Sequence, residues 1–293
     1  MEDEKLRLYA VKTKTVKVGD DPVKLIMESL KEQNLQLEDN DILAITSKII
    51  AYAEGRVAKL SEIKPSENAR KLAKKFSVKP EFAELILQEA DRIYGGVDKA
   101  VLTLKKGVLT ANAGIDNKNA PVNSVVLWPN NIEEYAKQIR EEIKRQTGKK
   151  IAVLIVDSGL IPLRIGTVGL ALAAAGFKPI KDCRGEKDIY GKLLAITRHA
   201  IADNIASAAH LLMGESDEKT PIVLIKDAPV DFDDDAHGLA DMIMPFKECI
   251  FMNTFLMGVT HSKKDTKFVF FKILNKAVPI KQEQVAMIIL SIG

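Results

Sequence analysis

The chain has 293 residues, of which 46% are hydrophobic and 28% charged, so it can bury a large core, and its net charge of only +3 gives no sign of a polyanion-binding face. Its two cysteines, Cys183 and Cys249, lack CxxC spacing, which argues against a disulfide scaffold or a zinc site. The charged first residues lead into no apolar stretch, and no apolar run is long enough to cross a bilayer. We therefore expect a soluble cytoplasmic protein with neither a membrane nor a nucleic-acid partner.

The first part of the chain predicts a half-exposed strand, an amphipathic helix and a buried strand. Residues 6–18 alternate Val and Thr with Lys, which is typical of a strand with one face in solvent. Residues 22–33 begin at a proline and carry an apolar stripe at helical spacing. The apolar run 42–46 predicts the buried strand, and Thr46 and Ser47 stand at its carboxyl end. Those hydroxyls either cap a following helix or help to hold an anion.

The next part predicts a pair of helices and a hairpin that ends in a loop of small and polar residues. The helices cover 66–76 and 80–91, and the hairpin strands cover 93–104 and 108–112. In the loop that follows, the backbone can approach a ligand closely, and Asp116 and Asn119 point a carboxylate and an amide into one place. An ordinary Asx turn is the alternative interpretation.

The next elements place acidic residues at two of their junctions. A helix is expected over 131–146, and the apolar run 151–156 predicts a buried strand that leads directly into Asp157 and Ser158. Residues 164–176 are small and apolar, and their pattern does not distinguish a helix from a strand. The charged, glycine-bounded segment 181–192 follows and predicts a lid, a subunit arm or a solvated loop. A helix over 197–213 and a strand over 222–225 are expected next, with Glu215 between them.

Beyond Asp227 the sequence carries no motif that we can interpret. The acidic run 231–235 beside His237 lacks the glycine and terminal glutamate of a calcium loop, so we expect a solvated loop there. A strand over 267–273 and an apolar helix or strand over 282–292 are expected to be structural.

The chemistry-bearing residues are hard oxygen ligands without histidine or cysteine. They are Thr46, Ser47, Asp116, Asn119, Asp157, Ser158 and Glu215. Such a set suits Mg²⁺ or Mn²⁺ bound together with substrate phosphates, because these ions take only one or two carboxylates each. Phosphoryl transfer is the chemistry that this combination favours.

Several of these stretches also share their residues with one known family. They are Gly19-Asp20-Asp21, the run Asp41 to Ile50 with Glu54-Gly55-Arg56, Asn112 to Asp116 with Asn119, Asp157-Ser158, Arg184-Gly185-Glu186 with Asp188, Tyr190-Gly191, and Met213-Gly214-Glu215. On these residues the chain resembles, from about Val16 to Asp227, the coenzyme F420-0:L-glutamate ligase family. Its members use GTP to add γ-linked glutamate to the lactyl phosphate arm of a deazaflavin.

The resemblance implies an α+β fold with mixed sheets and packed helices, in two intimately associated lobes that form an intertwined homodimer. It implies Mg²⁺ or Mn²⁺, with one ion on Asp116 and Asp157 and a second on Ser158 and Glu215. It implies nucleotide contacts from Thr13, Lys14, Thr15, Val16, Thr46, Ser47, Asn119, Gly214 and Ser216, and substrate contacts from Arg164, Arg184 and Asp188. In the implied mechanism GTP phosphorylates a substrate carboxylate and the glutamate amine displaces phosphate, so no side chain acts as a nucleophile.

The chain departs from the family pattern at three places. Residues 13–16 replace a Leu-Pro-Glu-like nucleotide contact, Tyr52 replaces a lysine, and Ile161 replaces a cationic residue. These departures keep open a non-catalytic homologue that binds a nucleotide or phosphometabolite, and a purely structural dimer module is a third hypothesis. Because the resemblance ends near Asp227, we divide the chain into a metal- and nucleotide-binding domain at 1–228 and an extension of unknown role at 229–293.

Overall fold

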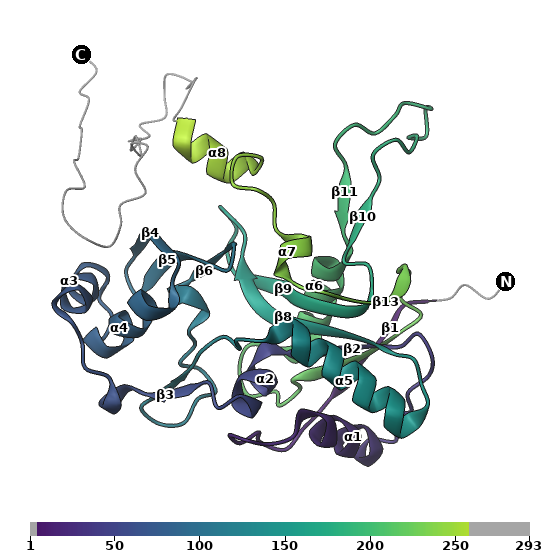
Figure 1. Ribbon diagram of the computed structural model, residues 1–293, viewed down its shortest axis with the longest axis horizontal. Coiled ribbons are helices and arrows are strands. Elements are labelled where there is room, and N and C mark those ends of the chain that lie inside the picture. Colours follow the sequence, from purple (N-terminus) through teal and green to yellow (C-terminus); the bar gives the residue numbers. More distant parts are fainter. Residues whose placement is uncertain (1–4, 258–293) are drawn as a thin grey trace. The chain divides into compact units, whose positions relative to one another are not determined.

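The computed structural model describes residues 5–257 (Figure 1). The chain divides into two units, Met1–Met242 and Ile243–Gly293. A six-stranded sheet lies at the centre of the first unit, with the strand order β1-β12-β2-β8-β9-β13. β2 and β8 pair in parallel, whereas the other neighbouring strands pair antiparallel. This mixed sheet, with separate helices, confirms the predicted α+β class. The strands are β1 (Arg7–Val11), β2 (Ile42–Thr46), β8 (Ala152–Leu160), β9 (Thr167–Phe177), β12 (Ile222–Lys226) and β13 (Phe232–His237).

Helices cover both faces of the central sheet, which explains why its inner strands are apolar at every position. In β2, Leu43 and Ile45 belong to one core, whereas Ile42 and Ala44 belong to the other. Side chains alternate between the two faces of a strand, so a strand covered on both faces reads as one continuous apolar run. The first core contains side chains of α1 (Pro22–Glu32), α2 (Ser47–Ala53) and α5 (Ile132–Thr147), and the second contains those of α6 (Ile201–Met213).

A separate core lies within the segment between α2 and α5. Phe76, Ile86, Val101, Ile115 and Val125 are among its buried members. The predicted helix pair and the hairpin at Gly107 are confirmed. The elements are β3 (Val57–Lys59), the 3₁₀ helix η1 (Leu60–Glu62), α3 (Glu67–Phe76), α4 (Pro80–Glu89), β4 (Arg92–Val97), β5 (Ala100–Lys105), β6 (Val108–Ala111), the 3₁₀ helix η2 (Asn112–Gly114) and β7 (Ser124–Val126).

The prediction of one strand over 93–104 is wrong, because β4 and β5 form a hairpin of their own. The chain reverses at Asp98 and Lys99, and Lys99 adopts a left-handed φ of 62°. Gly96 lets the two strands approach closely, since a Cβ there would lie 2.3 Å from the carbonyl oxygen of Ala100. The pair Gly95-Gly96 just before the turn was the signal in the sequence for this break.

Two strand boundaries also differ from the prediction. β1 ends at Val11, where its partner strand begins at Ile222, so residues 12–18 leave the sheet instead of extending the strand. β8 continues to Leu160, which places Asp157 and Ser158 inside the strand and not after it. The cause is β9, which pairs with β8 along its whole second half and gives the ambiguous segment 164–176 a strand conformation.

The later elements account for the remaining differences. The predicted helix 197–213 starts only at Ile201, because Arg198–Ala200 forms β11 and pairs with β10 (Ile180–Asp182). Figure 1 shows these two strands at the base of an arm that projects from the sheet. The expected solvated loop at 231–235 lies instead within or next to β13, whose exposed acids sit on a sheet edge, where charge discourages further strand pairing.

The chain after β13 contributes two short helices, α7 (Leu239–Met242) in the first unit and α8 (Ile250–Met257) in the second. The predicted elements at 267–273 and 282–292 lie outside the described residues. Among residues 5–257, no helix is long and apolar enough to span a membrane.

Candidate functional site

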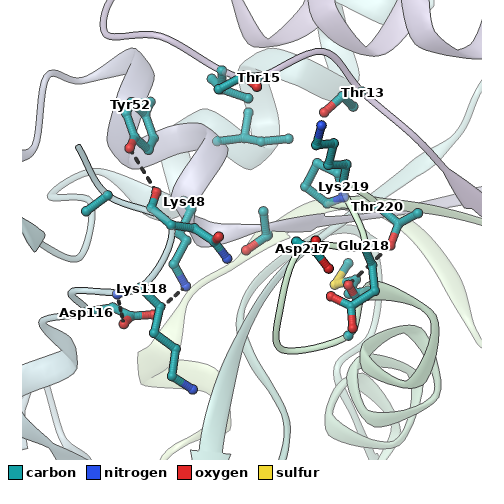
Figure 2. Close-up of a pocket in the computed structure, with 18 of the residues that line it drawn as sticks. Thr13, Thr15, Lys48, Tyr52, Asp116, Lys118, Asp217, Glu218, Lys219 and Thr220 are labelled. Carbon is teal, nitrogen blue, oxygen red and sulfur yellow. Dashed lines mark hydrogen bonds and ion pairs between the residues drawn. The ribbon is translucent and has the colours of Figure 1, made fainter. Parts of the chain in front are cut away.

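A pocket of about 640 Å³ opens at the edge of the central sheet where β2 ends beside Val156 of β8. The carboxyl ends of adjacent parallel strands meet at one edge, and ligands of such sheets bind there. Its walls come from residues 13–18, from the start of α2, from loop 116–121, from Val156 to Ser158, and from the end of α6 with loop 214–221. Figure 2 shows Lys48 and Asp116 on one side of this pocket and Asp217, Glu218 and Lys219 on the other.

Most of the residues singled out in the sequence meet in this pocket. Its lining includes Asp116, Asp157, Ser158, Glu215, Thr13, Lys14, Thr15, Val16, Thr46, Asn119, Gly214 and Ser216. Ser47 does not line it, because Ser47 begins α2 with its side chain in the core at 3% exposure. The pocket therefore combines the predicted metal ligands with all but one of the predicted nucleotide contacts.

The predicted substrate residues lie elsewhere. Arg164 is exposed in the turn between β8 and β9. Arg184 pairs with Asp182 in the arm, and Asp188 accepts hydrogen bonds there from the backbone of Tyr190 and Lys192, at 2.9 and 2.8 Å. Within one chain these three residues contribute nothing to the pocket wall.

Asp116 is held by its backbone and shares its carboxylate between two partners. Its N–H and C=O bond to Val126 at 3.0 and 2.8 Å, which fixes the loop beside β7. Oδ1 accepts the backbone N–H of Lys118 at 2.8 Å, and Oδ2 lies 2.7 Å from Lys48 Nζ. The Asx turn is thus present, and it leaves the second oxygen free to bind a cation.

Lys48 is the cation that the acids of the pocket surround. Burial disfavours its ammonium form, but Asp157 and Asp116, with a smaller contribution from Glu215, outweigh burial and raise the pKa of Lys48. Burial raises the pKa of Asp157, and its interaction with Lys48 offsets only part of that effect. A second cation near Asp157 would favour its ionised form further.

Glu215 is held by groups from three segments. Oε1 accepts the hydroxyl of Thr167 at 2.5 Å and lies 3.0 Å from His210 Nε2, while Oε2 lies 3.6 Å from Lys118 Nζ. Burial acts to raise the pKa of Glu215, but the bond from Thr167 and the neighbouring His210 and Lys118 outweigh it, so this pKa is lowered. The carboxylate is therefore kept ionised at the pocket wall.

Lys48 and Tyr52 also line the pocket, although neither was among the predicted site residues. Lys48 follows the Thr46-Ser47 pair, and Tyr52 lies four residues further on, which puts both on one face of α2. That spacing was the signal available for them. Tyr52 stands where a lysine was expected, and its hydroxyl donates to Asn119 O at 3.0 Å. The positive charge of the pocket comes instead from Lys48 and from lysines of other segments. The lysines that line the pocket are Lys14, Lys17, Lys48, Lys118 and Lys219.

The donor set fits a hard divalent ion that is bound jointly with a phosphorylated ligand. In the part of the chain that the structure describes, no group of three or more His, Cys, Asp and Glu side chains forms a ready-made metal cage. Asp116 and Asp157 nevertheless act on one cation, Lys48, and Ser158 and Glu215 add oxygen donors on the same pocket. Mg²⁺ is commonly held by one or two carboxylates, waters and substrate phosphates, which is the kind of site these residues can form.

Fold and pocket together define a mixed α+β protein with a lysine-lined pocket at one edge of its central sheet. The family model for F420-0:gamma-glutamyl ligase matches residues 10–227, so the chain belongs to that family. It is 39% identical over 218 residues to the coenzyme F420:L-glutamate ligase of Methanocaldococcus jannaschii, across 74% of this chain and 86% of the relative. The enzymes of the same name from Methanothermobacter thermautotrophicus and Archaeoglobus fulgidus are 37% and 36% identical, across 73% and 72% of this chain and 85% and 83% of each relative.

Proposed function

We propose that the protein is a GTP- and divalent-metal-dependent ligase that joins L-glutamate through an amide bond to F420-0 or to another phosphorylated carboxylate. The observation that carries this proposal is that Asp116, paired with Lys48, and Asp157 line the same pocket together with several lysines. A volume of about 640 Å³ is within the range of pockets that hold small molecules and cofactors. The relatives are named for the addition of glutamate to coenzyme F420.

The proposed division of the pocket follows its walls. Asp116 and Asp157 would hold one Mg²⁺ or Mn²⁺, and Ser158 and Glu215 a second. Segment 13–16, Thr46, Asn119 and loop 214–216 would contact GTP, with the lysines neutralising its phosphates. The metal ions, when bound, would neutralise charge on the transferred phosphoryl group.

The proposed reaction has two steps and requires no side-chain nucleophile. A carboxylate oxygen of the acceptor attacks the γ-phosphorus of GTP, the bond to the bridging oxygen breaks, and GDP leaves. The amine of glutamate then attacks the acyl carbon, and inorganic phosphate departs with the electrons of the carbon–oxygen bond. The amine loses a proton as the amide forms. Lys48 would stabilise negative charge on the phosphoryl oxygens, since preorganised cations act most strongly in a water-poor pocket.

We propose in addition that the protein acts as a homodimer in which the arm, residues 180–200, contacts the second copy. The arm exposes Ile189, Tyr190, Leu193 and Ile196 to between 66% and 91%. Apolar side chains gathered at the end of a projecting segment are typical of a protein–protein contact. Such a contact would also place Arg184 and Asp188, which lie outside the pocket of their own chain, against the second copy.

The proposal is tested by incubating the protein with GTP, Mn²⁺, L-glutamate and F420-0. We expect GDP release together with an acceptor mass gain of one glutamyl unit. Metal-dependent GTP binding without either product would support a non-catalytic homologue, which the tyrosine at position 52 favours. Absence of any metal-dependent thermal shift with GTP would contradict both functions.

A further inference from the structure

The indole of Trp128 lies behind the pocket, against the carboxylate of Asp157. Its Nε1–H donates to Asp157 Oδ2, and the backbone N–H of Ser158 donates to Oδ1 at 2.9 Å. Trp128 is only 2% exposed, so its ring cannot turn away. One donor on each oxygen fixes the orientation of the carboxylate and leaves further lone pairs for a ligand in the pocket.

The same ring also sets the position of the Asp116 loop. Gly114 has a left-handed φ of 69°, and a Cβ there would lie 2.4 Å from Trp128 Nε1. The indole therefore packs directly on the backbone two residues before Asp116. A single rigid side chain thus contacts both segments that present the proposed metal ligands.

A partly buried ion cluster lies against the Trp128 ring. Lys105 Nζ lies 5.7 Å from the centroid of the Trp128 ring and 2.6 Å from Glu89, and Arg56 pairs with the same glutamate at 2.8 Å. Arg56 Nε also donates to the carbonyl oxygen of Trp128 at 3.0 Å. Two cations against one carboxylate leave net positive charge there. A cation over the ring draws electron density from it and strengthens its N–H as a donor to Asp157.

We infer that Trp128 is a positioning residue for the metal site, which holds Asp157 and the Asp116 loop at the spacing that one divalent ion requires, with Lys105, Arg56 and Glu89 fixing the ring. This inference rests on the proposed function. Groups that orient metal ligands in this way typically contribute about 10- to 100-fold to metal affinity.

The sequence allows an exact chemical test, because Trp128 is the single tryptophan among the 293 residues. Expression in a tryptophan auxotroph can replace it by β-(3-benzothienyl)alanine, in which sulfur takes the place of the N–H. The matched control is the same protein carrying 5-fluorotryptophan, which keeps the N–H. Free Mn²⁺ is measured by electron paramagnetic resonance in the presence of GDP. We expect Mn²⁺ binding to be about tenfold weaker without the N–H and near wild type in the control.

Emission from the unmodified protein gives a second measurement that needs no variant. Mn²⁺ bound beside the indole should quench the fluorescence of Trp128, with the midpoint that the resonance titration gives, and Asp157→Asn should remove the quenching. Emission that stays constant while Mn²⁺ binds places the ion away from Trp128 and overturns the inference.

The remaining outcomes separate this inference from the proposed function. Equal Mn²⁺ affinity in the benzothienyl and fluorotryptophan proteins overturns the positioning role, while glutamyl transfer by both would leave the ligase intact. Failure of every form to bind Mn²⁺ or to transfer glutamate overturns the ligase, and the positioning role with it.

Discussion

The pocket and the arm contain most of the residues predicted to bind ligands. They differ in which groups pair with their charged side chains and in whether their apolar side chains are covered. In the pocket, Asp116 pairs with Lys48 from α2, and Glu215 with groups from β9, α6 and loop 116–121. In the arm, Arg184 pairs with Asp182 only two residues away, and large apolar side chains are exposed. The pocket is therefore completed by the tertiary fold of one chain, whereas the arm is a local structure whose apolar surface is left uncovered.

The largest expected effect comes from breaking the pairing at the pocket. Asp116→Asn keeps the bond from the Lys118 N–H but removes the charge that Lys48 and a divalent ion share. We expect ligase activity to fall by more than about 100-fold, beyond the loss typical of supporting residues, and the metal-dependent thermal shift with GTP to disappear. Glu141→Gln, an exposed change on α5, is the control. An Asp116→Asn protein with normal turnover would remove this carboxylate from the site.

Substitutions in the arm should weaken dimer formation without changing the stability of the single chain. Replacing Ile189 and Tyr190 by serine removes two exposed apolar side chains that make no core contact, so the melting temperature of one chain should change little. We expect the dimer dissociation constant to rise by at least about tenfold in sedimentation equilibrium. Lys187→Ser, an exposed change on the same arm, should leave it unchanged. A monomeric wild-type protein would contradict the proposed contact.

A smaller effect is expected at Tyr52, which ties the loop to α2 within the pocket. Tyr52→Phe removes the hydroxyl bond to Asn119 O, while the ring keeps its packing against Val126 and Ala120. Asn119 in turn donates to Ser216 O at 3.0 Å, so its position affects the facing loop. Calorimetry should show GDP binding weakened by about two- to tenfold, the range of one hydrogen bond. Tyr190→Phe in the arm is the matched control, and unchanged GDP affinity in Tyr52→Phe would refute the role of the tether.

The smallest effect concerns Asp203, which, within residues 5–257, has no cationic partner of the kind that the pocket acids have. Burial raises the pKa of Asp203, and the bond from Ala171 N–H at 3.0 Å only partly offsets this. An acid whose folded-state pKa is raised gives stability below its unfolded pKa of about 4 and loses it as pH rises through the folded value.

Asp203→Asn keeps an acceptor for Ala171 and should therefore be slightly more stable than wild type at pH 7, by less than about 1 kcal/mol. The gain should vanish below about pH 4, where the aspartate is protonated as well. Urea unfolding at the two pH values measures this difference. A variant that is less stable at pH 7 would show that the ionised carboxylate contributes to the fold.

Local patterns were sufficient for most helices, for the buried strands and for most of the pocket. The apolar runs at 42–46 and 151–156 predicted the two strands whose ends form its floor, and the residues around Asp116, Asp157 and Glu215 identified its acids. Partners distant in sequence could not be predicted in this way. Nothing local indicates that β9 would extend β8 past Asp157, or that Trp128 would donate to that carboxylate.

The direction in which a side chain points was the second feature that the sequence patterns did not predict. Ser47 and Lys48 are neighbours, yet the serine faces the core and the lysine faces the pocket, because consecutive residues of a helix point about 100° apart. Residues 12–18 have the composition of a strand, but β12 begins at Ile222, and the N–H of Thr13 bonds instead to Lys219 O in the loop before it, so the segment leaves the sheet and lines the pocket. A sequence pattern gives a segment its propensity for a strand, and the presence of a neighbouring strand decides whether the segment forms one.

The most direct test of the pocket is a crystal structure of the protein with GDP and Mn²⁺, recorded with anomalous scattering from manganese. We predict an anomalous peak coordinated by Asp116 and Asp157, with Lys48 displaced from Asp116 towards the phosphates and GDP lying along residues 13–16 and 214–216. Manganese bound elsewhere, or GDP outside this pocket, would contradict the assignment.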